Sequence, residues 1–331
     1  MKRFLWTFIL IYSIAFSGIG QEINNLIHSK DYASESWGEL GEIKEFGSGD
    51  QTMILLPGWG FDWTIFKDFI SNYEDQYKIY AVTFPGFGST AAPAMPEKTE
   101  SYADTYWTNG IIKGLTDLMD EKEIEKATLV SYFTYSNIIA TRIALDNPDR
   151  INKVVIISGM AKFTSNLVPY EPASLSQRIY YVEKSLAPQW FKTVSKETWD
   201  TGNFHAKAFT KDSVAAKKYW DQMSAVPIPI MVRYLCELYS TDLSLEYENL
   251  TMPVMVVLPS FTDEVLYTKE TSYIAPFFHY SWLGAKPASD KIAIVSISDS
   301  NAFIVDDQPE KLFQLIDEFM DDKLNRYQVV R

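Results

Sequence analysis

Few side chains in this sequence have the type that suits the base of a nucleophilic reaction. A serine or cysteine attacks efficiently only when a neighbouring group removes its proton, and histidine suits this role because it titrates near neutral pH. The 331 residues include three histidines, His28, His205 and His279, and one cysteine, Cys236. Any catalytic arrangement built on histidine therefore has to use one of these three positions.

The three histidines differ in how well they are placed to reach a site. His28 precedes the first expected strand. His279 precedes the last one, in a segment that we expect to run toward the N-terminal end of that strand, whereas sites in parallel sheets lie at the C-terminal ends. His205 is the only histidine that we expect to face a pocket, with a structural or solvent-facing role as the alternative.

Acidic residues offer a second kind of chemistry. Asp263, Glu264 and Asp299 follow expected strands, and paired carboxylates can perform acid–base work. The chain carries 43 acidic and 30 basic residues, a formal charge of −13, so a solvated acidic rim is the simpler interpretation. The same charge makes nucleic acid and anionic membranes poor partners.

The sequence predicts no resident metal or cofactor. It has no HExxH spacing, and one cysteine cannot form a cysteine-rich metal site. It also has neither a P-loop nor a GxGxxG fingerprint for a nucleotide. Cys236 cannot form an intrachain disulfide, so packing has to hold the fold together.

The N-terminal residues 1–20, MKRFLWTFILIYSIAFSGIG, have the layout of a secretory signal peptide. Lys2 and Arg3 precede an apolar run that ends in small residues. A membrane anchor is the alternative, but the run is shorter than the roughly 20 apolar residues of a spanning helix. We therefore expect an exported protein, periplasmic or secreted, with no membrane span after cleavage.

Short apolar runs alternate with amphipathic stretches along the rest of the chain. The expected strands are Thr52–Leu56, Ile79–Phe84, Ala127–Tyr132, Lys153–Ser158, Val254–Leu258 and Lys291–Ser296. The expected helices are Trp63–Tyr73, Ala103–Asp120, Tyr135–Asp146 and Pro309–Asp321. This alternation predicts an α/β fold with a mostly parallel central sheet flanked by helices.

One long interval interrupts the alternation. Residues 160–252 contain no comparable strand but several helical stretches rich in large aromatic residues. We interpret this interval as an inserted helical cap over the sheet edge. The core is then built from residues 21–159 and 253–331.

Five segments in order, with sequences FGSGDQTMILLPGWGFDWTIF, YAVTFPGFGST, ATLVSYFTYSNIIATRIALDNPDRINKVVIISG, STDLSLEYENLTMPVMVVLPSFTDEV and NAFIVDDQPEKLFQLIDEFM, resemble an α/β-hydrolase. The resemblance covers nearly the whole expected exported chain. It implies a serine on a sharp strand-to-helix turn, a histidine base, an acid that orients the histidine, and two backbone amides that bind an oxyanion.

The family positions for this chemistry hold other residues in this sequence. The resemblance places Phe133 at the nucleophile and Ala302 at the base, and either Thr262 or Asp263 at the acid. A phenylalanine ring cannot attack a carbonyl, and alanine cannot accept a proton. The nearby hydroxyls do not restore the function, because we expect Ser131 inside the strand and Ser136 inside the helix.

The resemblance also names the surroundings of the former catalytic centre. It implies oxyanion-like backbone amides at Trp59 and Thr134. We expect a ligand pocket lined by Gly58, Trp59, Phe133, Tyr135, Asp263 and His205.

Two functions follow from this reading. The first is an inactive pseudo-hydrolase that binds a small apolar or aromatic ligand or a protein partner. The second is an active esterase- or lipase-like hydrolase that uses a non-standard catalytic group. A third possibility is that Phe133 and Tyr135 simply fill the old cavity.

Overall fold

A computed structural model of the chain describes residues 40–95, 100–162, 174–244, 246–272, 274–283 and 291–324, and the backbone of residues 329–330. The expected signal peptide at residues 1–20 and His28 lie outside the described residues. Most of the predicted core and most of the predicted cap lie within them.

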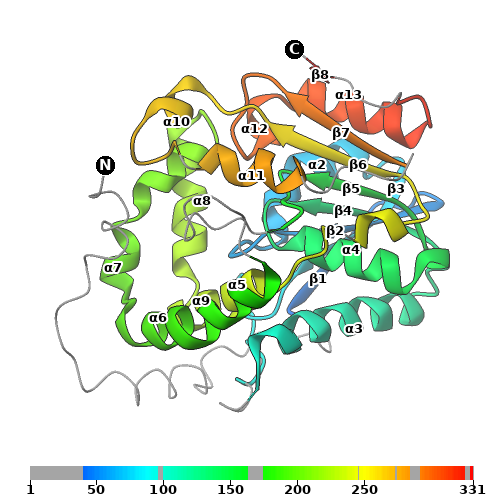
Figure 1. The fold of residues 1–331 in the computed structure, drawn as a ribbon. Coiled ribbons are helices and arrows are strands. Elements are labelled where there is room, and N and C mark those ends of the chain that lie inside the picture. Colours follow the sequence, from blue (N-terminus) through cyan, green and yellow to red (C-terminus); the bar gives the residue numbers. More distant parts are fainter. Residues whose placement is uncertain are drawn as a thin grey trace.

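The centre of the molecule is an eight-stranded sheet in the order β1-β3-β2-β4-β5-β6-β7-β8 (Figure 1). The strands are β1 Glu42–Phe46, β2 Gln51–Leu56, β3 Tyr77–Thr83, β4 Ala127–Tyr132, β5 Ile151–Ile157, β6 Val254–Pro259, β7 Ile292–Ile297 and β8 Val329–Val330. Every pairing is parallel except that of β1 with β3, which is antiparallel. The predicted mostly parallel sheet is confirmed.

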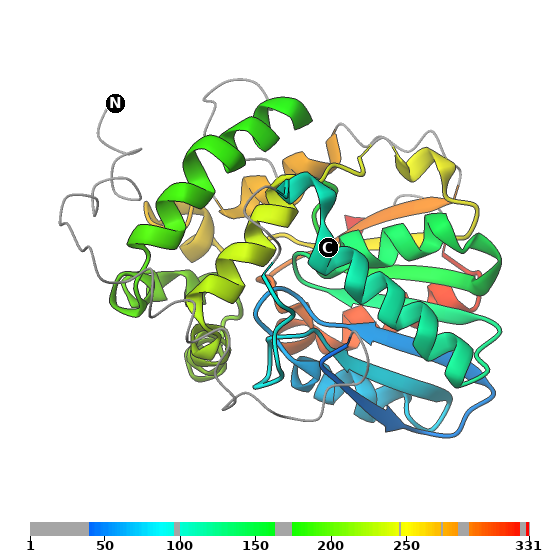
Figure 2. The ribbon, with the colours of Figure 1, turned by 90° about the horizontal axis from the view of Figure 1, so that it is seen from below.

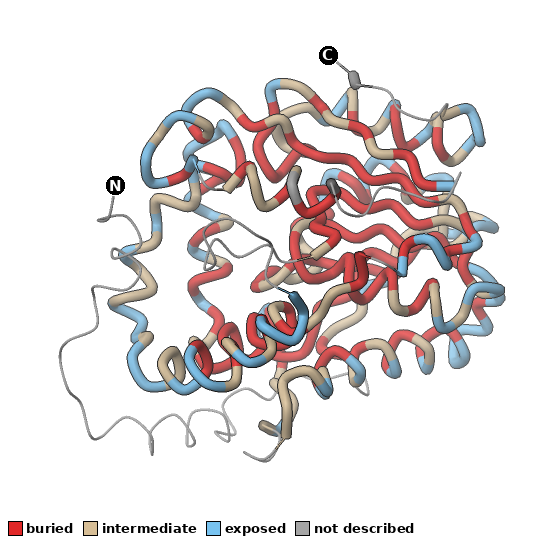
Figure 3. Tube along the Cα trace, in the orientation of Figure 1, coloured by how far each residue is buried: buried red, intermediate tan, exposed pale blue. Residues whose placement is uncertain are grey.

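Burial on both faces explains why these strands form. All six residues of β4 and of β6 are buried, and strands in the middle of a parallel sheet are nearly continuous apolar runs for this reason. Figure 3 shows the buried residues concentrated along the sheet. The sequence did not predict β1, because its EIKEF pattern is half polar and only half-buried, as suits an edge strand.

Helices cover both faces of the sheet. The core helices are α2 Lys67–Tyr73, α3 Tyr106–Glu121, α4 Ser136–Asp146, α10 Asp263–Tyr267, α11 Ile274–Leu283, α12 Ile304–Asp307 and α13 Pro309–Met320. Figure 2 shows α3 and α4 side by side along one face. On α2 and α13, the Tyr73 hydroxyl donates to Asp317 at 3.0 Å and the ring of Phe69 contacts that of Phe313.

A group of helices between β5 and β6 lies beyond one end of the sheet (Figures 1 and 2). Its members are α5 Leu175–Tyr181, α6 Ala187–Thr193, α7 Lys196–Asp200, α8 Ser213–Ala225 and α9 Ile228–Tyr239. We call this group the cap. Trp220, Met231 and Tyr234 of the cap belong to the same buried apolar cluster as the sheet, so the cap shares its core with the sheet.

Candidate functional site

Four neighbouring strands end in strained turns at the same edge of the sheet. Phe133 follows β4 with φ 68°, and Ser158 follows β5 with φ 52°. Phe261 follows β6 with φ 57°, and Asp299 follows β7 with φ 54°. Residues other than glycine at such angles cost on the order of 1–3 kcal/mol each and gather at functional sites. This edge, at the C-terminal ends of the strands, is therefore the candidate site.

Phe133 occupies the sharp turn between β4 and α4. Its amide donates to the carbonyl of Ile157 at 2.8 Å, which ties the turn to β5. The turn after β2 lies against it: a Cβ built on Gly58 would come within 2.7 Å of the Phe133 Cβ. Only glycine fits there without displacement. The structure thus brings Gly58 and Phe133 into direct contact.

The half-buried ring of Phe133 lies in a cluster of aromatic rings from several elements. Its neighbours, with centroid distances, are Phe61 at 5.7 Å, Phe209 at 5.8 Å, Phe278 at 6.1 Å and Phe303 at 5.5 Å. Rings at these separations add to the stability that their burial supplies. Sequence reasoning did not single out these four phenylalanines, because they come from four distant segments. The one local signal is that Phe61 stands in the same turn as Trp59.

Trp59 connects the turn after β2 to the cap. Its indole Nε1 donates to the carbonyl of Met231 in α9 at 3.1 Å, and its ring contacts that of Trp199. Its backbone amide donates to the carbonyl of Thr134 at 2.9 Å. In this structure the amide of Trp59 is therefore used inside the protein and does not point to a ligand oxygen.

Ala302 lies buried in the loop after β7, which also holds Asn301. The Ala302 amide donates to the carbonyl of Ala208 in the cap at 2.9 Å, and its carbonyl accepts from the Ser158 hydroxyl at 2.5 Å. The Asn301 Oδ1 accepts from the amide of Thr262 at 3.0 Å. The structure thus brings together the loops that carry the resemblance's base and acid positions, through an amide side chain.

The two candidates for the acid position differ in exposure. Asp263 is exposed in the first turn of α10, whereas Thr262 is half-buried and precedes that helix. Of the two candidates for the acid position, Thr262 is the one in contact with the loop after β7. No group of three or more histidine, cysteine or acidic residues that could hold a metal occurs in the described part of the chain.

Tyr135 lies in the core and not at the pocket surface. It is 1% exposed, and its ring packs on Phe84 and Tyr234. Its hydroxyl is 2.9 Å from the Thr108 hydroxyl of α3. Tyr135 also has φ 81°, a region where glycine is favoured. The Tyr135 side chain is therefore accommodated between the sheet, α3 and α9.

Ser131 and Ser136 are both fully buried, as expected for a strand and a helix residue. The Ser131 hydroxyl donates to the carbonyl of Val155, and the Ser136 hydroxyl donates to those of Tyr132 and Phe133. Neither hydroxyl is placed to attack a ligand.

His205 lies in the cap between aromatic rings. Its Nδ1 is 2.6 Å from the carbonyl of Gly202, and its ring stacks on Phe204 and lies nearly parallel to Trp220. Burial lowers the pKa of His205 below its ordinary value, and the contact with Gly202 opposes this. The neutral form is therefore favoured at neutral pH.

The prediction for His279 is wrong. Its Nε2 is 2.8 Å from the carbonyl of Pro259, the last residue of β6, so the ring lies at the C-terminal edge of the sheet. The reason is that α11 crosses the strand ends before the chain returns: Trp282 donates to the carbonyl of Gly159, just after β5. Burial lowers the pKa of His279 as well.

The described part of the chain contains no helix long and apolar enough to span a membrane. No protein-family model matches the chain.

Curated relatives match over part of their length. The chain is 25% identical over 122 residues to the pimeloyl-[acyl-carrier protein] methyl ester esterase of Vibrio campbellii, covering 37% of this chain and 42% of that protein.

A second relative is epoxide hydrolase 4 of Mus musculus, with 24% identity over 135 residues, or 40% of this chain and 35% of that protein. The chain therefore spans less than half the length of either relative. Both relatives are named as hydrolases.

Solved structures match over almost their whole length. An enol-lactonase from Burkholderia xenovorans has a TM-score of 0.61 at 12% identity, covering 85% of this chain and 96% of that chain. An esterase from Rhodococcus has a TM-score of 0.63 at 12% identity, covering 85% and 94%. Similarity at this level of identity concerns the fold. With the sheet order and flanking helices described above, it identifies the chain as a protein of the α/β-hydrolase fold.

Proposed function

We propose that this protein is a catalytically inactive relative of the hydrolases with this fold, and that it binds a small apolar or aromatic ligand against Phe133. The observation that carries the proposal is the residue at the strained turn between β4 and α4. By resemblance this turn presents a serine nucleophile, and here it presents a half-buried phenylalanine with φ 68°. A hydrocarbon ring supports binding and has no nucleophilic chemistry.

The surroundings support the same proposal. Four aromatic rings contact Phe133, and the loop that would carry the base has Ala302, whose backbone is bonded to the cap and to Ser158. An apolar surface of this kind favours uncharged ligands, because a buried ion needs a partner. A fatty alcohol, an ester or an aromatic compound suits this chemistry.

Absence of catalysis can be tested with a fluorophosphonate probe and p-nitrophenyl esters of short and long chains. We expect no labelling and no turnover above background for the wild-type protein or for Phe133→Ser, because the variant regains a hydroxyl without regaining a base. Turnover by the wild-type protein would contradict the proposal.

Such turnover would support the alternative, an esterase- or lipase-like enzyme that uses a non-standard group. One observation favours this alternative: His279 lies at the C-terminal end of β6, beside the candidate site. Loss of the turnover in His279→Ala, but not in His205→Ala, would assign the base.

Ligand binding can be tested by thermal shift against fatty alcohols, fatty acid esters and aromatic compounds, since a ligand of the folded state raises its stability by mass action. We expect Phe133→Ala to weaken a stabilising compound by about tenfold or more, because a buried ring contributes about 1.5–3 kcal/mol. Phe313→Ala is the matched control, a half-buried phenylalanine of α13 far from the cap. Equal affinity in wild type and Phe133→Ala would exclude Phe133 as the site.

Binding of a protein partner, in place of a small ligand, is the alternative function. It is favoured if no compound raises the melting temperature while co-purification from the native source yields a stoichiometric partner. In that case the aromatic cluster around Phe133 fills the old cavity and has a structural role.

We also propose that the protein acts outside the cytoplasm, on the basis of the N-terminal sequence with Lys2, Arg3 and the following apolar run. Intact-mass analysis of protein from the native source tests this. A mature chain that starts at Gln21, recovered from the periplasm or the medium, is the expected result. A chain that retains residues 1–20 in the cytosolic fraction would contradict it.

A further inference from the structure

The segment after β7, residues 301–307, is bonded to the cap along its backbone. By resemblance this loop carries the catalytic base, and here it contacts the cap segment at residues 207–211, which includes the end of the 3-10 helix Asn203–Ala208. The bonds across the contact are Asn301 Nδ2 to the Lys207 carbonyl at 2.9 Å, Ala302 N to the Ala208 carbonyl at 2.9 Å and Phe303 N to the Phe209 carbonyl at 2.6 Å. We call residues 301–307 the latch segment.

Two carboxylates of α12 extend the contact. Asp307 accepts from the Thr210 hydroxyl at 2.7 Å and from the Lys211 amide at 2.9 Å, and it also accepts from the Asn301 amide at 2.7 Å. Hydrogen bonds to a charged acceptor are about twice as strong as neutral ones. Asp307 therefore holds the cap segment and the latch segment at once.

Asp306 joins α12 to α8 of the cap. Both of its carboxylate oxygens lie 3.0 Å from the Tyr219 hydroxyl, which can donate its one proton to either. The Tyr219 ring stacks on Phe303 with centroids 4.2 Å apart and planes 17° apart. The contact therefore combines a polar link with an apolar one, and both pass through the cap residue Tyr219.

Three other carboxylates contribute to the electrostatic surroundings of Asp306. The groups that face it are Tyr219 and Asp212 of α8 and its N-cap, Asp68 of α2, Asp307 of α12 and Tyr132 of β4. Burial is the main cause that raises the pKa of Asp306, to about 6, and the carboxylates of Asp307, Asp68 and Asp212 add to it. The hydrogen bond from Tyr219 opposes these effects.

We propose that the latch segment holds the cap closed over the C-terminal ends of the strands, and that ionisation of Asp306 weakens this closure. The protonated carboxyl carries no charge to repel Asp307, Asp68 and Asp212, whereas the ionised one repels all three across a partly dry contact. The inference does not rest on the proposed function, because a latch controls access to the site whether the site binds or hydrolyses its ligand.

The direction of the pH effect follows from linkage. In the closed state the pKa of Asp306 is raised to about 6, whereas a solvated aspartate has 3.8. Closure is therefore strongest in acid and is progressively lost as pH rises from the ordinary value through about 6. Between pH 5 and pH 8 the equilibrium constant for closing should fall by about tenfold. Most of the fall occurs between pH 5 and about 6, because above the raised pKa Asp306 is ionised in both the closed and the open state.

Hydrogen exchange tests this inference directly on the full chain. The amides of Ala302, Phe303 and Lys211 donate across the contact and report its opening. After correction for the intrinsic chemical rate, we expect their protection to be about tenfold lower at pH 8 than at pH 5. The amide of Val130, inside β4, is the internal reference and should keep its protection.

Substitutions separate Asp306 from other titrating groups. Asp306→Asn keeps an acceptor for Tyr219 without the charge, so the protection of the three amides should no longer depend on pH. Tyr219→Phe removes the hydrogen bond that opposes the raised pKa, so the fall should move to higher pH. Asp75→Asn, at an exposed turn after α2, is the matched control and should behave as wild type.

Equal protection at pH 5 and pH 8 in the wild-type protein would overturn the inference. So would a wild-type pH dependence that persists in Asp306→Asn. Should Asp306→Asn fail to fold, the pH profile of amide protection in the wild type and in Tyr219→Phe tests the inference. If protection falls at the same pH in both proteins, Asp306 is excluded as the titrating group.

Discussion

Two of the polar contacts that join the cap to the core differ in their balance of charge. The first contact lies between α9 and α3. There Arg233 and Glu237, both of α9, form a buried ion pair with N···O distances of 3.0 and 2.7 Å. At the second, between the cap and α12, Asp306 and Asp307 receive hydrogen bonds from neutral groups of the cap. The two contacts therefore respond differently to pH and to mutation.

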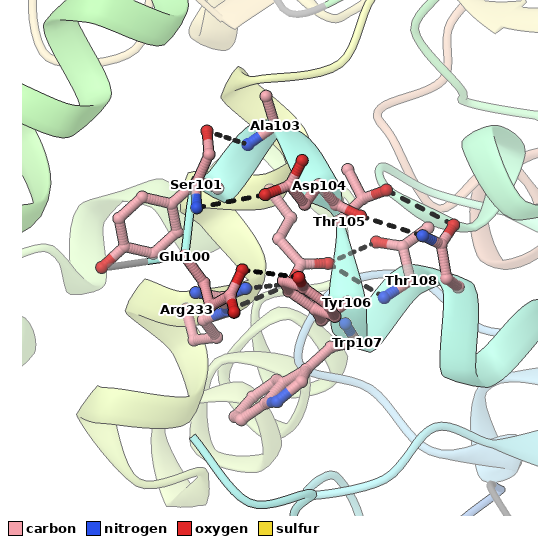
Figure 4. Close-up of polar contacts among 12 residues, drawn as sticks. Glu100, Ser101, Ala103, Asp104, Thr105, Tyr106, Trp107, Thr108 and Arg233 are labelled. Atoms are coloured by element: carbon pink, nitrogen blue, oxygen red, sulfur yellow. Dashed lines mark hydrogen bonds and ion pairs between the residues drawn. The ribbon is translucent and has the colours of Figure 1, made fainter. Parts of the chain in front are cut away.

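At the first contact, both carboxylate oxygens of Glu237 accept hydrogen bonds. Glu237 is fully buried and also accepts from the Trp107 amide at 3.1 Å, the Thr108 amide at 2.9 Å and the Thr108 hydroxyl at 2.7 Å, at the start of α3. Figure 4 shows Arg233 and the beginning of α3 gathered at this place. The guanidinium also lies over the rings of Tyr102 and Trp107, at 4.6 and 5.9 Å from their centroids. A negative charge at a helix N-terminus is favourable.

The comparison teaches which side of the cap can open. Removing one partner of a buried ion pair lowers the stability of the fold strongly, because the other charge stays buried without compensation. The α12 side has carboxylates close to one another, and its strength depends on the protonation of Asp306. We infer that the α9 contact acts as the fixed hinge side and the α12 contact as the side that yields.

The largest expected effect is at the fixed side. Glu237→Ala should lower the free energy of unfolding by about 3–5 kcal/mol, because Arg233 and two α3 amides lose their acceptor in the interior. Urea denaturation followed by circular dichroism measures this. The matched control is Glu183→Ala, which removes a carboxylate that accepts from Ser101 and Tyr102 in a less buried link. Equal losses in both variants would contradict the distinction.

An intermediate effect is expected at Asp307. Asp307→Ala removes two hydrogen bonds that join the cap segment to the latch segment and one from Asn301 within the latch segment, so we expect a loss of about 2 kcal/mol. Because these bonds lie on the yielding side, limited proteolysis should cut the cap faster while the sheet core stays resistant. Unfolding of the sheet and the cap in one step, at the wild-type denaturant midpoint, would show that Asp307 does not hold the cap.

The smallest effect is expected at the exposed ion pair beside it. Lys211 Nζ lies 2.8 Å from Asp299, and both side chains are at least one-third exposed. Lys211→Ala should change the free energy of unfolding by about 0–1 kcal/mol, because surface ion pairs are screened by water and salt. The change should shrink further in high salt. A loss as large as that of Asp307→Ala would mean that the ion pair, and not the carboxylate of Asp307, holds the contact.

Local patterns were enough to predict most of the sheet. The strand Ala127–Tyr132 was predicted with its observed bounds, because its six consecutive buried residues are mostly apolar and carry no charge. The resemblance placed Phe133 at the turn after it. The antiparallel edge strand β1 was not predicted, because its charged residues alternate with apolar ones in a half-exposed segment. Such a sequence is equally compatible with a loop.

Long-range contacts limited the prediction of the site. The sequence pointed to Tyr135 as a pocket residue, but its ring lies between Phe84 and Tyr234 in the core. His279 was expected at the wrong end of the sheet, because the path of α11 across the strand ends depends on packing with distant segments. Periodicity describes which face of an element is buried and does not say against what it is buried.

The sequence by itself determined that Phe133 and Ala302 stand at the positions that the resemblance assigns to the nucleophile and the base, because residue types and their order can be read without the fold. It also determined the alternation that builds the sheet. Only the tertiary structure decided that Phe133 meets four other phenylalanines and that the loop of Ala302 is bonded to the cap. The raised pKa of Asp306 likewise exists only where the fold buries it beside Asp68 and Asp212, two residues far away in the chain.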